Sequence, residues 1–377
     1  MKNRFAAVCS AAVVRILLLT GTVSAYAQST STSSLPFVSQ AVASFDQPWA
    51  VAFLPENQAL VTERSGRLKW VDLATGNSQA VAGVPEVEYG GQGGLGDVVL
   101  HPQFAQNRWV YWSYAEVGER SSAGAAIARG RLEVTEKGPS LHDVSVIWRQ
   151  VPKVSGRGHY AHRLLFDRDD LLWVSSGDRQ QFDPAQDLQS NLGKVLRLTD
   201  EGAAVEGNPF FKQGGVAAQV WSLGHRNPLG IAFDAQGQLW EVEMGPRGGD
   251  ELNRIERGSN YGYPIVSNGD HYSGRTIPDH DTRPEFKAPL ITWTPVISPS
   301  SMVVYQGDDF PDWRGNALIS GLSSQSLVRV ELKATTAREV ERFDMGRRIR
   351  AVAQAPDGAL WVLEDGKKGR LLRLTPS

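Results

Sequence analysis

The sequence predicts an all-β protein folded as a six-bladed β-propeller, and three observations support this prediction. A pattern of a short apolar strand, a turn and a second strand recurs along the chain, hairpin turns separate the strands, and no convincing amphipathic helix of ten or more residues is present. Clear copies of the pattern occupy residues 50–63, 163–178, 230–243 and 351–365. Looser copies start near Val98 and Met302, so the spacing is irregular, about 45 to 70 residues. About six copies imply six blades.

The turns inside the copies have hairpin chemistry. Gly237-Gln238 and Asp357-Gly358 each stand between two strands of alternating or apolar character. A sandwich of generic hairpins is the alternative fold, but it accounts less well for the repeated Phe…Leu-Trp framework. Residues 366–374 are predicted to be a late strand that completes a blade with the N-terminus of the mature chain.

Residues 1–27 are predicted to form a secretory signal peptide. Lys2 and Arg4 precede an apolar run, and Ala25-Tyr-Ala27 supplies the small residues of a cleavage site. A membrane anchor is the alternative, but it needs roughly 18 uninterrupted apolar residues, and this run is far shorter. We therefore expect a periplasmic or secreted protein.

The mature chain is expected to consist of a disordered leader at residues 28–36 and one propeller domain at residues 37–377. The only cysteine of the full sequence, Cys9, lies in the signal segment, so disulfides, thiolate metal sites and cysteine nucleophiles are excluded from the mature chain. Loss of the three signal cations would change the formal net charge from −2 to −5. This mildly acidic balance argues against nucleic acid and anionic membranes as partners.

A glycine-rich segment at Gly91–Gly96 formally matches the dinucleotide fingerprint Gly-x-Gly-x-x-Gly. That fingerprint requires a following helix in a βαβ unit, whereas the residues after Gly96 resemble a strand. We therefore reject a nicotinamide site and interpret the segment as a turn that carries one amide, Gln92, near a central channel.

Two histidines lie just before a repeated strand, at His159 and His162. They do not form the helical pair of a zinc protease. His159 is the candidate general base because an imidazole titrates near neutral pH. Asp178, at the end of the next strand, is the candidate for orienting it. A structural histidine and a turn-capping aspartate remain the alternatives.

Arginines gather at two further segments that precede repeated strands. Arg226 is followed by Asn227 and supplies a permanent cation for an anionic ligand or a developing oxyanion. Arg348 and Arg350 would point to the same face of an extended segment. Solvated surface arginines are the alternative.

The segment Glu243–Pro264 combines oxygen donors with glycine and proline residues. Ca²⁺ takes six to eight oxygen ligands, and loops rich in carboxylates and exposed backbone carbonyls supply them. We therefore expect a Ca²⁺ loop here, with an acidic surface turn as the alternative.

Taken together, these segments resemble the PQQ-dependent soluble glucose and aldose sugar dehydrogenases, which are six-bladed propellers. The resemblance spans essentially the whole mature chain in order, and its Arg-Asn-Pro and Gly-Pro-Arg-Gly-Gly-Asp-Glu blocks are specific. It is carried by residues 91–97, 158–160, 177–178, 224–228, 245–251, 260–264, 310–315 and 348–350.

The resemblance implies a quinoprotein enzyme with PQQ and Ca²⁺ as cofactors. His159 would accept the proton of the sugar C1 hydroxyl while hydride passes from C1 to PQQ, Asp178 would support the histidine, and Arg226 would stabilise charge on the cofactor. The residues implied to bind the cofactor are Gln92, Arg226, Asn227, Tyr272, Arg348 and Arg350, with Trp293 and Asp365 at further pocket positions. Gly245 and Pro246 would bind the catalytic Ca²⁺, and Glu251 and Tyr261 a second, structural Ca²⁺.

The chain departs from the family pattern at three places. The family usually reads His-x-Gly-Gly-Arg where this chain has His159-Tyr-Ala-His-Arg163, and it usually has a histidine where Met244 stands. Ser323 stands where a cofactor-binding lysine is expected. One lost ammonium–carboxylate contact would weaken PQQ binding by roughly 1.5–3 kcal/mol.

The sequence thus predicts a PQQ- and Ca²⁺-dependent dehydrogenase that oxidises the C1 hydroxyl of aldoses to lactones. Its partners would be a small sugar and an electron acceptor, a cytochrome or a quinone. A related propeller that binds a ligand without redox chemistry is the first alternative, suggested by Ser323 and His162. A Ca²⁺-dependent lactonase is the second.

Overall fold

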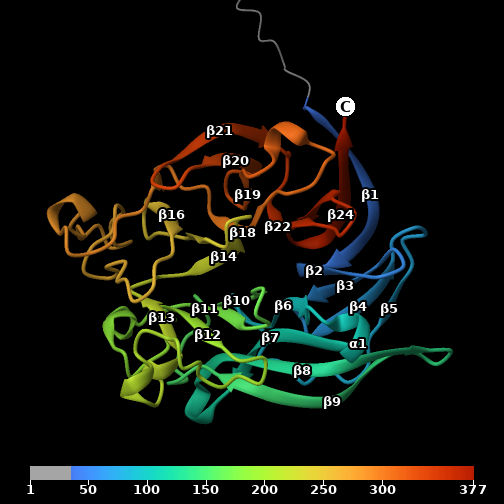
Figure 1. The fold of residues 1–377 in the computed structure, drawn as a ribbon, viewed down its shortest axis with the longest axis horizontal. Helices are drawn as coiled ribbons and strands as arrows, with labels where there is room; N and C mark the ends of the chain where they lie inside the picture. Colours follow the sequence, from blue (N-terminus) through green and yellow to red (C-terminus); the bar gives the residue numbers. More distant parts are fainter. Residues whose placement is uncertain (1–34) are drawn as a thin grey trace, which may run out of the picture. The chain divides into compact units, whose positions relative to one another are not determined.

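The computed structural model describes residues 35–377, and Pro36–Ser377 form one compact unit. Six four-stranded antiparallel sheets surround a central axis (Figure 1), so the predicted six-bladed β-propeller is confirmed. The predicted signal peptide lies outside the described residues, as does all of the predicted leader except its last two residues.

The strands follow the chain from the innermost to the outermost position of each blade. Blade 1 contains β2 (Pro48–Leu54), β3 (Gln58–Glu63), β4 (Arg67–Asp72) and β5 (Ser78–Ala80). Blade 2 contains β6 (Leu95–Leu100), β7 (Trp109–Val117), β8 (Ala123–Thr135) and β9 (Gly138–Arg149). Blade 3 contains β10 (Ala161–Phe166), β11 (Leu172–Ser176), β12 (Lys194–Leu198) and β13 (Val220–Leu223).

Blades 4 to 6 complete the circle. Blade 4 contains β14 (Pro228–Phe233), β15 (Leu239–Glu243), β16 (Asp250–Arg254) and β17 (Ile291–Trp293). Blade 5 contains β18 (Pro299–Val304), β19 (Ala317–Gly321), β20 (Ser326–Leu332) and β21 (Ala337–Asp344). Blade 6 contains β22 (Ile349–Gln354), β23 (Leu360–Glu364), β24 (Lys367–Pro376) and, outermost, β1 (Phe37–Asp46).

The ring closes within blade 6, where the first strand of the described chain meets the last. β1 pairs antiparallel with β24 over its full length, from Phe37 opposite Pro376 to Asp46 opposite Lys367. The predicted closure of a blade by the C-terminal strand and the N-terminal strand is therefore confirmed. The inner strands contact one another in sequence around the axis, and β22 contacts β2.

Helices are few in the described part of the chain. One α-helix, α1 (Phe104–Asn107), lies in the β6–β7 connection. Short 3₁₀ turns occupy Glu119–Ser121, Asp183–Gln186, Phe211–Gln213, Ala217–Gln219, His280–Thr282 and Pro311–Trp313. None of the helices among residues 35–377 has the length and apolar character needed to cross a bilayer.

The repeated Phe-Asp…Leu-Trp pattern has a physical cause in the hairpins of blades 3 and 4. The carboxylate of Asp167 accepts hydrogen bonds from the turn N–H groups of Asp169 and Leu171, and from the indole N–H of Trp173 at 2.8 Å. Asp234 does the same in blade 4, where it accepts from the indole of Trp240 at 2.9 Å. The aspartate therefore both closes the turn and satisfies the indole N–H of a buried tryptophan.

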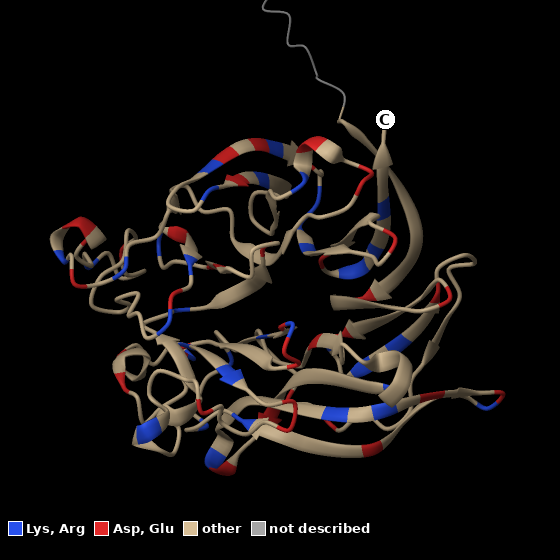
Figure 2. Cartoon of the chain, viewed as in Figure 1, with Lys and Arg blue, Asp and Glu red and all other residues tan. Residues whose placement is uncertain are grey.

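The second strands of four blades are fully buried, whereas the outermost strand of blade 5 is largely exposed. Every residue of the second strands β11, β15, β19 and β23 is buried. The outermost strand β21, by contrast, carries acidic and basic residues in alternation along an exposed edge (Figure 2). Charges on such an edge discourage pairing with other chains.

A β-bulge interrupts each inner strand at the same place. In all six blades the pairing between the first and second strands shifts register immediately after the first residue of the inner strand. A bulge changes the direction in which a side chain points. The second residue of each inner strand lies in the bulge, and these six residues are Trp49, Gly96, His162, Leu229, Ser300 and Arg350.

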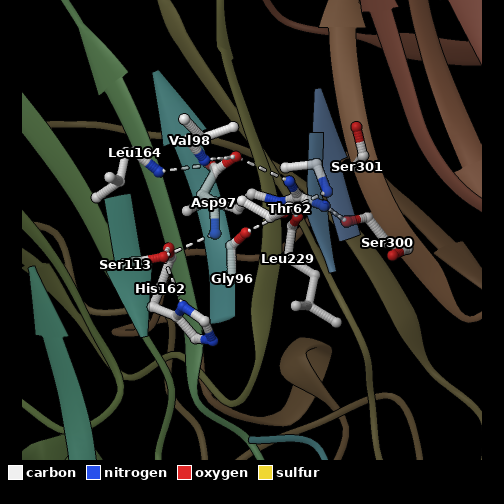
Figure 3. A network of polar contacts seen from close by, with 12 residues as sticks. Thr62, Gly96, Asp97, Val98, Ser113, His162, Leu164, Leu229, Ser300 and Ser301 are labelled. Atoms are coloured by element: carbon white, nitrogen blue, oxygen red, sulfur yellow. Dashed lines mark hydrogen bonds and ion pairs between the residues drawn. The ribbon is translucent and has the colours of Figure 1, made fainter. Parts of the chain in front are cut away.

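One buried arginine links four blades at the axis, and Figure 3 labels its partners Asp97, Leu229 and Ser300. Arg163 of β10 donates to the carboxylate of Asp97 in β6 at 3.2 Å, to the carbonyl of Leu229 in β14 at 2.7 Å and to the carbonyl of Ser300 in β18 at 2.5 Å. Asp97 also accepts from the backbone N–H groups of Val98 and Leu164. Burial lowers the pKa of Arg163 to about 10, yet the guanidinium stays charged at neutral pH.

Candidate active site

A cavity of about 380 Å³ lies at the axis, within the size range of ligand pockets. Its walls come from the bulged residues of the inner strands, from residues that follow the second strands, and from loops. They are Trp49, Arg64, Gly91, Gln92, Tyr160, Ala161, His162, Leu229, Met244, Ser298, Leu322, Arg348, Arg350 and Asp365.

His159 and Asp178 form a buried pair beside this cavity. The Nδ1 atom of His159 lies 2.6 Å from Oδ1 of Asp178, and the two residues are 6% and 0% exposed. Asp178 Oδ1 also accepts the backbone N–H of Gln180 at 2.9 Å. Because Asp178 is bonded to Nδ1, Nε2 is the nitrogen of His159 that can act on a substrate. The predicted juxtaposition of base and orienting carboxylate is present.

The surroundings of His159 favour its neutral form. Burial lowers its pKa from the ordinary value of 6.5, Asp178 opposes this effect, and the positive charges of Arg226 and Arg179 add to it. The net direction is downward. His159 therefore remains available as a proton acceptor below the pH at which an ordinary histidine becomes protonated.

Arg179 and Gly177 hold this pair in place, and the sequence analysis assigned a role to neither. Arg179 donates to the carbonyls of Gly158, Ala123 and Gly156, and its guanidinium lies over the ring of Tyr160 at 3.7 Å. A Cβ at position 177 would stand 2.0 Å from the His159 carbonyl oxygen, so only glycine fits there.

Arg226 and Asn227 follow from β13 into β14 and are both buried. The side chain of Glu243 accepts the backbone N–H of Arg226 at 2.5 Å and thereby fixes this turn. The guanidinium of Arg226 donates to the carbonyls of Met244 and Gly245. Its Nε atom, and Oδ1 of Asn227, are buried without a hydrogen-bond partner among residues 35–377.

Arg348 and Arg350 share one carboxylate at the cavity wall. Asp365 accepts from Arg348 at 2.9 Å and from Arg350 at 2.8 Å. Burial would raise the pKa of Asp365, but Arg350 and Arg348 outweigh this effect and the pKa is lowered. Asp365 is thus ionised and sets the positions of the two guanidinium groups.

Arg64 is a third guanidinium at the cavity that the sequence analysis missed. It donates to the carbonyls of Gly91 and Gly93, and its Nε is buried without a partner in the described chain. Ser323, by contrast, is exposed, and its hydroxyl donates to the carbonyl of Val296. The cation missing at Ser323 therefore has a counterpart in Arg64, on another blade.

The remaining predicted cofactor residues have different fates. Gln92 lines the cavity, and its side-chain oxygen accepts the backbone N–H of His159 at 2.7 Å. Tyr272 is 73% exposed, with its ring 5.9 Å from the guanidinium of Arg226. Trp293 is not brought to the cavity. It lies on the outermost strand of blade 4, is buried in an apolar cluster, and donates to Glu339 on β21 at 2.6 Å.

The four predicted metal ligands, which the resemblance divides between a catalytic and a structural Ca²⁺ site, all line one very small cavity. Gly245, Pro246, Glu251 and Tyr261 all line a space of about 10 Å³, which is about the volume that one water-sized sphere requires. The Gly245 carbonyl also accepts from Arg226, so this arginine and a metal ion would share that oxygen.

Buried carboxylates surround this small cavity, and two of the nearby residues were not predicted. Glu243 and Glu251 face each other across β15 and β16, and Glu241 faces Asn253 two pairs further along. His225 lies beside them, with Nδ1 3.2 Å from Glu243. One ligand atom each from His225, Glu241 and Glu243 lies within 4.8 Å of the others. Burial, together with the charge of Glu243, raises the pKa of both Glu241 and Glu251 well above the ordinary value.

The repeats contain the signal that would have located the missed cavity residues. Arg64, Met244, Leu322 and Asp365 each come directly after the second strand of a blade, and all four line the cavity. Three of them follow a glutamate that ends that strand. Equivalent positions in a propeller lie at equivalent places around the axis. Aligning the copies would therefore have identified Arg64 as a cavity residue, at the position that Asp365 holds in blade 6.

A larger cavity of about 730 Å³ lies between blades 3 and 4. Its lining includes Phe166, Trp173, Trp221 and Phe233, and it contains none of the predicted site residues. The titratable pair and the three guanidinium groups are at the axial cavity instead.

Comparison with known proteins agrees with this geometry. A model of the glucose/sorbosone dehydrogenase family matches residues 45–373. An aldose sugar dehydrogenase of Escherichia coli (strain K12) is 41% identical over 339 residues, which cover 88% of this chain and 90% of that protein.

Two solved structures extend the comparison to three dimensions. The apo-form of the soluble aldose sugar dehydrogenase from Escherichia coli has a TM-score of 0.84 at 39% identity, covering 90% of this chain and 100% of that one. The PQQ-bound form of the aldose sugar dehydrogenase from Streptomyces coelicolor has a TM-score of 0.74 at 30% identity, covering 90% and 98%. Since the family model spans most of the chain, this protein belongs to the glucose/sorbosone dehydrogenase family.

Proposed function

We propose that this protein is a PQQ- and Ca²⁺-dependent dehydrogenase that oxidises the C1 hydroxyl of aldose sugars to the lactone. The observation that carries the proposal is the buried His159–Asp178 pair next to a cavity walled by Arg64, Arg348 and Arg350. A base with a lowered pKa stands beside a binding site for an anionic ligand. The PQQ-bound relative from Streptomyces coelicolor supports the choice of cofactor.

His159 is the residue that would remove the hydroxyl proton. Its Nδ1–H is held by Asp178, which leaves the lone pair of Nε2 to accept the proton. The resulting imidazolium is stabilised by the ionised carboxylate at 2.6 Å. Asp178 is therefore a positioning residue that also offsets the developing charge.

The residues present fit the chemistry of PQQ. PQQ has three carboxylates and two quinone oxygens, and the site offers three guanidinium groups together with buried polar atoms that have no other partner among residues 35–377. These atoms are the donors Nε of Arg64 and Nε of Arg226. When bound, PQQ supplies the two-electron acceptor that no amino acid side chain can provide. Arg226 would then hold the negative charge that develops near its guanidinium.

Ca²⁺ fits the small cavity beside Arg226. Apart from His225, all the possible ligand atoms are oxygens, and oxygen ligands suit a hard cation such as Ca²⁺. Three glutamates lie buried within two neighbouring strands, and Glu241 Oε1 has no hydrogen-bond partner among residues 35–377. A divalent cation would offset the mutual repulsion of these carboxylates.

Reconstitution tests the proposal. The mature protein is treated with a chelator, titrated with PQQ and Ca²⁺, and assayed for dye reduction with a panel of aldoses. We expect saturable PQQ binding and sugar-dependent turnover, and His159→Ala should retain PQQ binding while losing turnover. Absence of PQQ binding in the presence of Ca²⁺ would refute the proposal.

Ser323 and His162 favour a second candidate, a propeller that binds a ligand without redox chemistry. That candidate predicts sugar or quinone binding without dye reduction. A lactonase predicts hydrolysis of sugar lactones that requires Ca²⁺ but no PQQ. For the leading proposal, the partners are a small sugar and a cytochrome or quinone acceptor, and the site of action is the periplasm or the exterior.

A further inference from the structure

His162 is the bulged residue of blade 3 and the ionisable side chain next to Arg163 at the axis. Its imidazole is 2% exposed, stacks on the indole of Trp49 at 5.1 Å, and lies over Gly96 (Figure 3). A Cβ at Gly96 would stand 1.9 Å from the His162 ring. Gly96, the second residue of the blade 2 inner strand, therefore contributes no side chain here, and the His162 ring occupies the space beside it.

The backbone at His162 is unfavourable for a residue with a side chain. Its φ is +51°, and that of Ala161 is +55°. This left-handed conformation costs roughly 1–2 kcal/mol for a residue other than glycine. An imidazole kept at such a position, on the wall of the axial cavity, is a candidate for a role in binding.

The hydrogen bonds of Ser113 determine which nitrogen of His162 carries the proton. The hydroxyl oxygen of Ser113 lies 2.8 Å from the Asp97 N–H, 2.8 Å from the His162 carbonyl oxygen and 2.6 Å from His162 Nδ1. Two oxygens at 2.8 Å repel unless a proton lies between them, so the serine donates its proton to the carbonyl. Nδ1 must then donate to the serine, and Nε2 carries the free lone pair.

This lone pair belongs to a residue of the cavity wall and has no partner among residues 35–377. Burial and the charge of Arg163 lower the pKa of His162 to about 3, so the ring is neutral at working pH. The charged groups that line the cavity with it are Arg64, Arg348, Arg350 and Asp365. His162 thus adds a neutral acceptor to a site otherwise rich in donors.

We propose that His162 is a cofactor-positioning residue whose Nε2 accepts a hydrogen bond from the pyrrole N–H of PQQ. This inference depends on the proposed function. Oxidised PQQ presents ionised carboxylates, quinone carbonyls and a pyridine nitrogen, all of which accept hydrogen bonds. Its pyrrole N–H is the one fixed donor, and a neutral acceptor among guanidinium groups is complementary to it.

Three substitutions separate this role from a structural one. His162→Phe keeps an aromatic ring against Trp49 but has no acceptor. His162→Gln can place an amide oxygen where Nε2 lies, whereas the shorter His162→Asn reaches Ser113 but not the cavity. Affinity for PQQ is measured in the Ca²⁺-loaded protein by quenching of tryptophan fluorescence, and thermal unfolding of each variant checks its fold.

We expect about tenfold weaker PQQ binding for His162→Phe and His162→Asn, and binding within about twofold of the wild type for His162→Gln. Equal affinity in all four proteins would overturn the inference while leaving the proposed function intact. A wild-type protein that binds no PQQ would instead defeat the proposed function, and this inference with it. If His162→Phe fails to fold, the comparison of Gln with Asn still decides.

Nitrogen NMR gives a readout that is independent of affinity. In ¹⁵N-histidine-labelled apo-protein, the Nε2 signal of His162, assigned by its loss in His162→Gln, should have the shift of an unprotonated nitrogen. Addition of PQQ should move it toward the shift of a hydrogen-bonded acceptor. A protonated Nε2 in the apo-protein, or no movement on saturation with PQQ, would contradict the proposal.

Discussion

Replacing Asp178 with asparagine tests the acid–base pair at a single atom. Oδ1 of Asp178 accepts from both His159 Nδ1 and the N–H of Gln180, while Oδ2 is buried without a partner among residues 35–377. In Asp178→Asn the amide oxygen should stay at the Oδ1 position, because the opposite orientation would set an NH₂ group against the Gln180 N–H. His159 therefore keeps its tautomer, and the substitution removes only the negative charge of the neighbouring carboxylate.

This geometry sets the size of the effect. A hydrogen bond to a charged group contributes roughly 1.5–3 kcal/mol and one between neutral groups roughly 0.5–1.5 kcal/mol. The difference of about 1–2 kcal/mol corresponds to a loss of about 5- to 30-fold in kcat. An inverted tautomer would cost far more, on the order of 10⁴-fold.

The pH profile gives a second measure in the same experiment. Burial lowers the pKa of His159, and Asp178 acts in the opposite direction, so loss of the carboxylate charge should lower it further. Because the neutral form is the active one, the acid limb of kcat/KM should lie below pH 6.5 in the wild type and at lower pH still in Asp178→Asn. The assay is dye reduction by the reconstituted enzyme. An unchanged kcat, or a 10⁴-fold loss, would refute the assignment.

The remaining predictions concern stability. Arg163→Met should lower the free energy of unfolding, measured in urea, by roughly 3–5 kcal/mol, because it leaves Asp97 buried and unpaired. The control Arg131→Met, at an exposed ion pair, should lower it by less than about 1 kcal/mol. Equal losses in the two variants would contradict the role of the axial network. Ca²⁺ at 100 times its Kd should stabilise the apo-protein by roughly 2.7 kcal/mol, seen as a higher Tm. Glu251→Gln should remove most of this stabilisation. If the variant is stabilised by Ca²⁺ as much as the wild type, the ion binds elsewhere. The pKa of His162 is lowered to about 3, so the unfolded chain binds a proton below pH 6.5 that the native protein does not. Stability should therefore fall as pH falls through this window, and at pH 4 His162→Phe should avoid roughly 3 kcal/mol of that loss; parallel pH–stability curves for the two proteins would show that the buried imidazole titrates normally.

Many residues near the axial cavity could be predicted from short sequence segments, because they occupy fixed positions relative to the repeated hairpins. His159 and Asp178 flank the blade 3 hairpin, and Arg348 and Arg350 lie at the start of the last one, so their position near the axis follows from the propeller itself. The resemblance implied a pocket position for Trp293, but this residue lies on the outermost strand of blade 4, away from the cavity. The outermost strand of a blade points away from the axis, and only the strand order reveals this.

The sequence by itself determined the six-bladed architecture and the closure of the last blade, and it placed His159 and Asp178 at the two ends of one hairpin, because these features depend on periodicity and on hairpin chemistry within short segments. Only the tertiary structure decided which side chains share the axial cavity. Arg64 and Ser323 follow the second strands of different blades. The stacking of His162 on Trp49, across Gly96, depends on bulges in three separate inner strands. The Ca²⁺ candidates likewise depend on the register of β15 and β16, which places Glu243 opposite Glu251. Contacts between blades arise from the closed ring, and no local pattern of residues specifies them.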